Sequence, residues 1–188
     1  YIAVPYLSAE QRPGTPAFAG VLRTIYQFGC LCRDNGIQLL YHNHDFEFVS
    51  FSGMYALDFL YAAMPEDVLK TEIDVCWVKY AGEDPAAYLR KYAGRAPVVH
   101  LKDFVGRKEG DAAPYGLLGQ SETKAAGEVP FEFRPVGYGC QDVSAVAEAG
   151  LDAGAKWFVV EQDASVGRTP LEAAAMSIDT LRKIGLKG

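Results

Sequence analysis

Residues 37–48 read Ile37-Gln38-Leu39-Leu40-Tyr41-His42-Asn43-His44-Asp45-Phe46-Glu47-Phe48 and join an apolar run to a dense group of polar side chains. The apolar run follows Gly36 and is typical of a buried strand. This strand brings two of the chain's three histidines, His42 and His44, to its C-terminal end together with two carboxylates. Neutral imidazole and carboxylate are ligands of divalent metal ions and also groups that transfer protons. Hydrogen-bonded structural histidines are the alternative interpretation.

The composition is that of a globular protein with neither a nucleic-acid nor a membrane partner. The chain has 188 residues, 49% hydrophobic and 22% charged, which suits a single domain over residues 1–188 with a sizeable core. A net charge of −6 disfavours a nucleic-acid surface, because phosphate binding depends on Lys and Arg. No apolar run in the sequence reaches the roughly 18–20 residues of a membrane span.

The cysteines and the start of the chain give information on the cellular location of the protein. Cys30, Cys32, Cys76 and Cys140 show no CxxC or zinc-ribbon spacing, so we expect reduced thiols and a cytoplasmic location. The sequence lacks an initiator Met, and residues 1–7 already have the pattern of a core strand. We therefore expect the beginning of the chain to be missing, which leaves an upstream signal peptide open.

Strand patterns alternate with helical patterns along most of the chain, which predicts a parallel α/β sheet. Strands are predicted over residues 1–7, 37–44, 70–78, 97–102, 131–134 and 156–162. Helices are predicted over residues 17–33, 55–64, 84–92, 142–149 and 169–184, and a long loop over an active site at residues 106–128. No linker divides the chain.

Four residues of metal-ligand type lie at or just beyond the ends of predicted strands: Glu47, Asp74, His100 and Glu161. The first three follow one another at about the length of one βα unit of a (β/α)8 TIM barrel, roughly 31 residues. The fourth lies about two units further on, and the predicted strand at 131–134 fills the gap. The four side chains are therefore expected to converge at the C-terminal face, where such barrels keep their active sites.

Five segments carry a resemblance to a known family: Tyr41–Phe48, Ile73–Trp77 with Ala81–Pro85, Val99–Asp103, Pro135–Gly139 and Val160–Asp163. Their order and spacing resemble the sugar phosphate isomerase/epimerase family, the xylose isomerase-like TIM barrels that also include inosose dehydratases and endonuclease IV. The resemblance implies that residues 1–188 hold strands three to eight of an eight-stranded barrel. The first two βα units are then missing, and the barrel is partial.

The resemblance also implies a metal centre. One divalent ion (Mn, Zn, Mg or Co) is expected on Glu47, Asp74, His100 and Glu161. Relatives carry the first of these ligands as a Glu in the strand, where this chain has Leu40 or Tyr41. Glu47 is our choice for that ligand, and His42 or His44 is the alternative.

Such a site would remove a proton next to a sugar carbonyl and return a proton elsewhere. The predicted catalytic residues are Glu161, His44 and Lys102, and the predicted substrate-binding residues are His42, Trp77 and Arg134. Lys102 follows His100 by two residues, so both are expected to point into the barrel. A structural ion pair of Lys102 with Asp103 or Glu132 is the alternative. Glu72 shares the parity of Asp74 and is interpreted as a polar core residue.

The leading functional hypothesis is a metal-dependent isomerase or epimerase acting on a small sugar, keto-sugar or sugar phosphate. A lyase, either a dehydratase or a glycoside-eliminating enzyme, is the first alternative, because it shares the proton-abstraction step. A non-catalytic sugar-binding subunit and an endonuclease IV-like nuclease are further alternatives. The expected partner is a small carbohydrate, and a homo-oligomer stays open.

Overall fold

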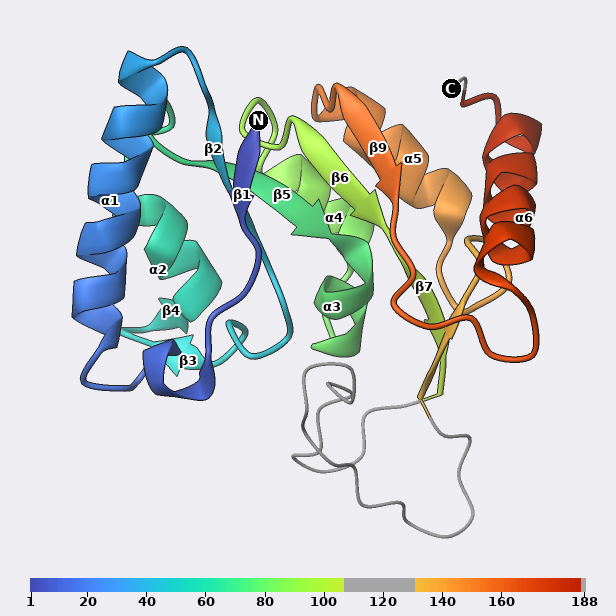
Figure 1. Ribbon diagram of the computed structural model, residues 1–188, viewed down its shortest axis with the longest axis horizontal. Helices are drawn as coiled ribbons and strands as arrows, with labels where there is room; N and C mark the ends of the chain where they lie inside the picture. Colours follow the sequence, from blue (N-terminus) through green and yellow to red (C-terminus); the bar gives the residue numbers. More distant parts are fainter. Residues whose placement is uncertain (107–130, 187–188) are drawn as a thin grey trace, which may run out of the picture.

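The computed structural model describes residues 1–106 and 131–186, and a parallel sheet forms the centre of this part of the chain. Its five strands, in spatial order, are β1 (Ile2–Val4), β2 (Leu39–His42), β5 (Lys70–Asp74), β6 (Val98–Leu101) and β9 (Trp157–Val160). Every neighbouring pair is parallel and the spatial order follows the chain order (Figure 1). The C-terminal ends of all five strands therefore lie along one edge, as in a partial (β/α)8 barrel, and the predicted fold class is confirmed.

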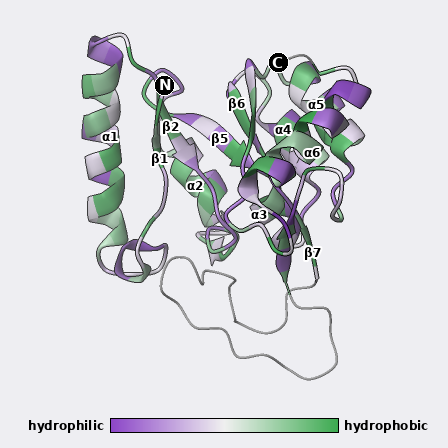
Figure 2. Cartoon of the chain, turned by 45° about the vertical axis from the view of Figure 1, so that its right-hand side comes forward, coloured by the Kyte–Doolittle hydropathy of each residue, from purple (hydrophilic) through white to green (hydrophobic). Residues whose placement is uncertain are grey.

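Most of the helices pack on one face of this sheet, and the helix that directly follows β5 lies at the C-terminal edge of the sheet. The α-helices are α1 (Phe18–Asp34), α2 (Ala56–Ala62), α3 (Val75–Tyr80), α4 (Pro85–Lys91), α5 (Val143–Asp152) and α6 (Pro170–Lys183), and η1 (Ala9–Gln11) is a short 3₁₀ turn. Alternate strand residues such as Tyr41, Ile73 and Val99 share a buried core with Ile25 of α1 and Leu89 of α4. In Figure 2 helices α1 and α5 carry both hydrophobic and hydrophilic residues, as expected for helices with one face on a core. None of the helices in the described ranges has the length and apolar character needed to cross a bilayer.

The strand predicted over residues 70–78 is wrong beyond Asp74. Strand β5 ends at Asp74, and α3 begins at the next residue. The Asp74 carboxylate caps this helix, because its Oδ1 atom accepts hydrogen bonds from the N–H groups of Cys76 at 2.8 Å and Trp77 at 3.1 Å. Residues 75–78 are buried throughout, and a short apolar run does not distinguish a buried helix from a buried strand.

Two antiparallel hairpins lie outside the parallel sheet. Strand β8 (Glu132–Arg134) pairs with β7 (Asp103–Val105), while β9 pairs directly with β6. The predicted strand at 131–134 is thus present as residues 132–134, but its predicted place between β6 and β9 is wrong, because β6 pairs directly with β9 and β8 pairs with β7. A tight hairpin of β3 (Ser50–Phe51) and β4 (Met54–Tyr55) lies between β2 and α2, where no strand was predicted. The loop predicted over 106–128 lies almost wholly outside the described residues.

The Asp103 carboxylate holds the loop that follows β8 against the end of β6. Its Oδ2 atom accepts the N–H groups of Gly137 and Gly139, both at 2.9 Å. Its Oδ1 atom accepts those of Phe104 at 2.9 Å and Gln141 at 3.1 Å. A Cβ atom at Gly139 would lie 2.2 Å from Asp103 Oδ1, so this close approach requires glycine. The Asp103 carboxylate therefore fixes the backbone of this loop through four N–H groups, and it is not the ion-pair partner of Lys102.

We predict that Asp103→Asn lowers the free energy of unfolding by about 2–4 kcal/mol. The amide keeps one accepting oxygen, so two of the four backbone donors, which lie in buried or partly buried hydrogen bonds, lose their partner. Urea unfolding measures the loss. Asp142→Asn is the matched control, since Asp142 only caps α5 through one hydrogen bond, and Asn caps helices about as well. Equal losses of unfolding free energy in Asp103→Asn and Asp142→Asn would contradict this role of the Asp103 carboxylate.

Candidate metal centre

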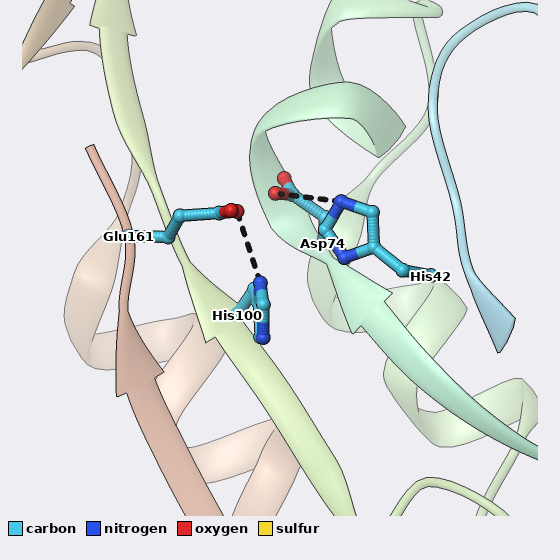
Figure 3. A group of neighbouring side chains, drawn as sticks. All are labelled: His42, Asp74, His100 and Glu161. Atoms are coloured by element: carbon cyan, nitrogen blue, oxygen red, sulfur yellow. Dashed lines mark hydrogen bonds and ion pairs between the residues drawn. The ribbon is translucent and has the colours of Figure 1, made fainter. Parts of the chain in front are cut away.

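Four side chains from four neighbouring strands meet at the C-terminal edge of the sheet. They are His42 at the end of β2, Asp74 at the end of β5, His100 in β6 and Glu161 directly after β9. One ligand atom from each lies within 4.8 Å of the other three (Figure 3). The structure thus brings together three of the residues predicted as metal ligands, and it adds His42, one of the two predicted alternatives to Glu47.

Strand register explains this convergence. His100 lies directly opposite Asp74, and His42 lies directly opposite Glu72. Successive side chains of a strand point to opposite faces, so these residues share the face away from the helices. Glu161 extends the same alternation beyond Val159, the residue that pairs with His100. The side chains therefore approach one another because the strands are parallel and nearly in register at this edge.

Hydrogen bonds and charges tie the cluster together. His100 Nδ1 lies 2.9 Å from Glu161 Oε2, and Lys102 Nζ lies 3.0 Å from the same oxygen. Burial alone would lower the pKa of His100, but hydrogen bonds to Glu161 and Glu72 raise it to about 10. Burial alone would raise the pKa of Glu161, but His100 and Lys102 hold it well below its ordinary value. Glu161 is therefore ionised at neutral pH.

The donor set fits a divalent cation. Two imidazoles and two carboxylates are ligands that Zn²⁺ and related ions accept. Asp74 Oδ2 is fully buried and has no hydrogen-bond partner in the part of the chain that the structure describes. Four carboxylates also gather here. Those of Asp74, Glu161 and Asp163 lie near the buried Lys102 ammonium, and that of Glu72 lies near both imidazoles. Ligands about 2.1 Å from one ion lie at most about 4.2 Å apart, so a small contraction of the cluster would complete the site.

Glu47, the predicted first ligand, lies elsewhere. Its carboxylate is fully buried and accepts hydrogen bonds from the Tyr41 hydroxyl at 2.6 Å and the His44 N–H at 2.8 Å. Tyr41 points to the helix side of the sheet and belongs to the core there. The structure therefore places Glu47 under the turn after β2, outside the group of four converging ligands.

His44 and Trp77 form an aromatic wall beside the cluster. The His44 ring stacks on Phe46 and on Trp77, with ring centres 5.3 Å and 5.4 Å apart. Burial lowers the pKa of His44 to about 2, so its imidazole is neutral. Trp77 is only 1% exposed and also stacks on Phe131. Both side chains lie next to the cluster, but the indole lies within the wall and is not open to solvent.

Lys102 lies inside the site, whereas Arg134 lies to one side. The Lys102 ammonium is 3.0 Å from Asp163 Oδ2 and 3.6 Å from Asp74 Oδ2, besides its contact with Glu161. The Arg134 guanidinium forms an ion pair with Glu132 on the same strand, β8. Phe133, between them, is the residue of β8 whose ring contacts Lys102. The Arg134 side chain therefore points away from the cluster, because successive side chains of a strand point to opposite faces.

Glu72 belongs to the site although its sequence position indicated only a polar core residue. Its carboxylate lies 3.2 Å from His100 Nε2 and 3.5 Å from His42 Nδ1. The only signal in the sequence was its parity with Asp74, two residues later on the same strand. That parity predicted the face but not the two imidazole neighbours, which depend on the register of β2 and β6.

The strand order and the ligands at the C-terminal edge define a (β/α)8-type barrel with a candidate metal site. Residues 7–184 match the family model of the xylose isomerase-like TIM barrel, and the chain belongs to this family. The resemblance drawn from the sequence segments is thereby confirmed. A comparison with curated proteins finds no significant match.

Solved structures show the same fold at low sequence identity. A sugar phosphate isomerase/epimerase from Parabacteroides distasonis is 20% identical with a TM-score of 0.69, and the match covers 96% of this chain and 56% of that one. A xylose isomerase domain protein from Planctomyces limnophilus is 14% identical with a TM-score of 0.64, covering 97% and 56%. A D-tagatose 3-epimerase-like protein is 14% identical with a TM-score of 0.57, covering 87% and 52%. The chain thus spans about half the length of these proteins.

We predict that Glu47 makes stability depend on pH. Burial raises its pKa from 4.5 to about 7, although hydrogen bonds from Tyr41 and His44 oppose the shift. Between these values the folded chain holds a proton at Glu47 that the unfolded chain releases, so the stabilisation from this residue falls as pH rises. Glu47→Gln does not titrate, so the difference in unfolding free energy between the two proteins should change by about 2–3 kcal/mol over this window.

Urea unfolding of both proteins at several pH values from about 4 to about 8 measures this difference. Using the difference removes the titration of all other groups, which the two proteins share. A difference that stays constant over the whole range would show that the pKa of Glu47 is the same in the folded and unfolded chain.

Proposed function

We propose that His42, Asp74, His100 and Glu161 hold one divalent metal ion in an enzyme that isomerises or epimerises a small sugar, keto-sugar or sugar phosphate. The observation that supports this most is the convergence of four ligand-type side chains within 4.8 Å at the edge where barrels of this family keep their active sites. The sugar-directed part of the proposal draws on the family and on the neighbours with the same fold. His42 takes the place first predicted for Glu47.

The ligand types narrow the choice of ion. Two imidazoles favour Zn²⁺, Mn²⁺ or Co²⁺ over Mg²⁺, which prefers oxygen ligands and retains water. When bound, such an ion supplies Lewis acidity that polarises a sugar carbonyl and acidifies the neighbouring C–H group. The fully buried Asp74 Oδ2 and the 3.8 Å gap between it and His42 Nε2 are consistent with a cation position between them.

Glu161 is the proposed general base. Its contacts with His100 and Lys102 both use Oε2, which leaves Oε1 as the oxygen to meet a substrate C–H. Its side chain is 33% exposed, whereas that of Asp74 is fully buried, so Glu161 is the ligand that a substrate can reach. The Lys102 ammonium, 3.0 Å from Glu161, would orient the carboxylate and donate a hydrogen bond to a substrate oxygen.

A lyase is the second candidate, and the position of Glu47 favours it. An epimerase that works with two glutamates needs a second carboxylate facing the substrate, and Glu47 is sealed behind Tyr41 and the His44 backbone. Glu161 then remains as the base, and the Lys102 ammonium, 3.0 Å from Glu161 and not one of the four ligands, would be the proton donor. Removal of a proton by Glu161 and protonation of a leaving hydroxyl by Lys102 would give an unsaturated product. Detection of that product distinguishes the lyase from the isomerase.

We expect His42→Ala to weaken the binding of Zn²⁺ or Mn²⁺ by at least about 100-fold, because it removes one of four ligands. Glu47→Gln should leave the affinity within about threefold, because Glu47 lies outside the cluster. Isothermal titration calorimetry of the metal-free chain measures both, and circular dichroism confirms that each variant is folded. The reverse ranking of the two variants would return the first ligand position to Glu47.

We expect Glu161→Gln to slow proton exchange by roughly 10²–10⁴-fold, because the amide cannot accept the substrate proton. The assay follows deuterium uptake from D₂O at the carbon next to the carbonyl in a panel of keto-sugars and their phosphates. Asp163→Asn is the control, since Asp163 contacts Lys102 but is not one of the four ligands. Near-normal exchange in Glu161→Gln would place the base elsewhere, and His44 would be tested next.

A further inference from the structure

One carboxylate lies between the two imidazoles of the cluster. Glu72 projects from the middle of β5, and its side chain is only 12% exposed. Its Oε1 atom lies 3.2 Å from His100 Nε2, and its Oε2 atom lies 3.5 Å from His42 Nδ1. The two oxygens of a single side chain thus face two different histidines.

Each imidazole uses its other nitrogen to face the cluster. His42 Nε2 lies 3.8 Å from Asp74 Oδ2, and His100 Nδ1 lies 2.9 Å from Glu161 Oε2. The two rings are therefore presented with opposite nitrogens, with Nε2 from His42 and Nδ1 from His100. Their ring centres are 4.8 Å apart, so a single acceptor between them can serve both rings.

The 3.5 Å contact between His42 Nδ1 and Glu72 Oε2 is at the distance limit of a hydrogen bond. His42 Nδ1 is buried and has no hydrogen-bond partner among residues 1–106 and 131–186. A buried N–H without an acceptor costs about 1–3 kcal/mol, and the nearest anionic oxygen is Glu72 Oε2. The small contraction that would bring the four ligand atoms onto one ion involves the same ring.

We propose that Glu72 is a positioning residue that sets the tautomers of both imidazoles. Glu72 Oε2 accepts the Nδ1–H of His42, and Glu72 Oε1 accepts the Nε2–H of His100. The proton on His100 Nδ1 that faces Glu161 Oε2 is released when the ion binds, and His42 Nε2 and His100 Nδ1 then both direct a lone pair at the cluster. This inference rests on the proposed metal-binding function, and Glu72 itself does not bind the ion.

The role requires a carboxylate, because only a carboxylate accepts hydrogen bonds at both ends. Glutamine at this position has one accepting oxygen and one donating NH₂ group. It would satisfy one histidine and present a donor to the other, which would then turn its lone pair toward residue 72 and its N–H toward the cluster. Glu72→Gln therefore changes the function of one ligand while nearly preserving side-chain volume.

The test uses Zn²⁺ alone, titrated into the metal-free chain by calorimetry. Glu72→Gln should weaken Zn²⁺ binding by about 10–100-fold, the usual effect of losing a partner of a metal-ligating histidine. Glu83→Gln is the matched control, because Glu83 accepts a hydrogen bond from the Tyr55 hydroxyl and is not among the clustered ligands. It should bind Zn²⁺ like the wild type. A folded Glu72→Gln protein with wild-type affinity would overturn the positioning role.

A second measurement needs no variant. Long-range ¹H–¹⁵N correlation spectra of the Zn²⁺-loaded wild-type chain report which nitrogen of each imidazole carries hydrogen. The proposal expects the proton on Nδ1 of His42 and on Nε2 of His100, and the opposite tautomer at either ring would overturn it. A wild-type chain that binds no Zn²⁺ would overturn the proposed function together with this inference. Wild-type binding with the wrong tautomers would overturn the inference alone.

Discussion

The buried ammonium group of Lys102 is the charge on which the arrangement of the site depends. It lies 3.0 Å from Glu161, 3.0 Å from Asp163 and 3.6 Å from Asp74, and its side chain is only 2% exposed. The Lys102 ammonium and the His100 imidazolium together do not balance these three carboxylates and Glu72, and burying an uncompensated charge is costly. A divalent cation would add the positive charge that the cluster lacks. The electrostatics and the proposed function therefore lead to the same requirement.

Asp74 links this requirement to the fold. One of its oxygens caps α3, and the other is directed into the cluster. The cap fixes the position where β5 ends and α3 begins, and hence the position of the second oxygen. The Asn43 side chain adds to this by bonding the Asp74 backbone at both its N–H and its carbonyl. A metal ligand held by a helix cap and a neighbouring strand needs little reorganisation on binding.

Much of this arrangement was predictable from the sequence, and the exceptions have physical causes. The spacing of Asp74, His100 and Glu161 predicted the barrel edge because βα units have a nearly constant length. Glu47, predicted as the first ligand, lies outside the cluster because β2 ends at His42, two residues earlier than predicted, and the chain then turns Glu47 back under the strand. The turn depends on tertiary contacts with Tyr41 that no local pattern reveals.

Glu72 and β8 also show that a sequence pattern does not reveal which residues are neighbours across a sheet. The parity of Glu72 placed it on the correct face, but its role depends on which residues of β2 and β6 lie beside it. A strand was predicted at residues 131–134, where β8 lies, but no strand was predicted directly after β6, where its partner β7 lies. The local sequence pattern therefore predicted the strands and the face to which a side chain points. The neighbours of a residue on adjacent strands could be identified only from the structure.

Anomalous scattering from a crystal soaked in Mn²⁺ tests most directly whether one divalent ion binds at His42, Asp74, His100 and Glu161. We predict one strong peak about 2.0–2.3 Å from His42 Nε2, Asp74 Oδ2, His100 Nδ1 and a Glu161 oxygen. A peak coordinated by Glu47, or a well-ordered cluster without any peak, would contradict it.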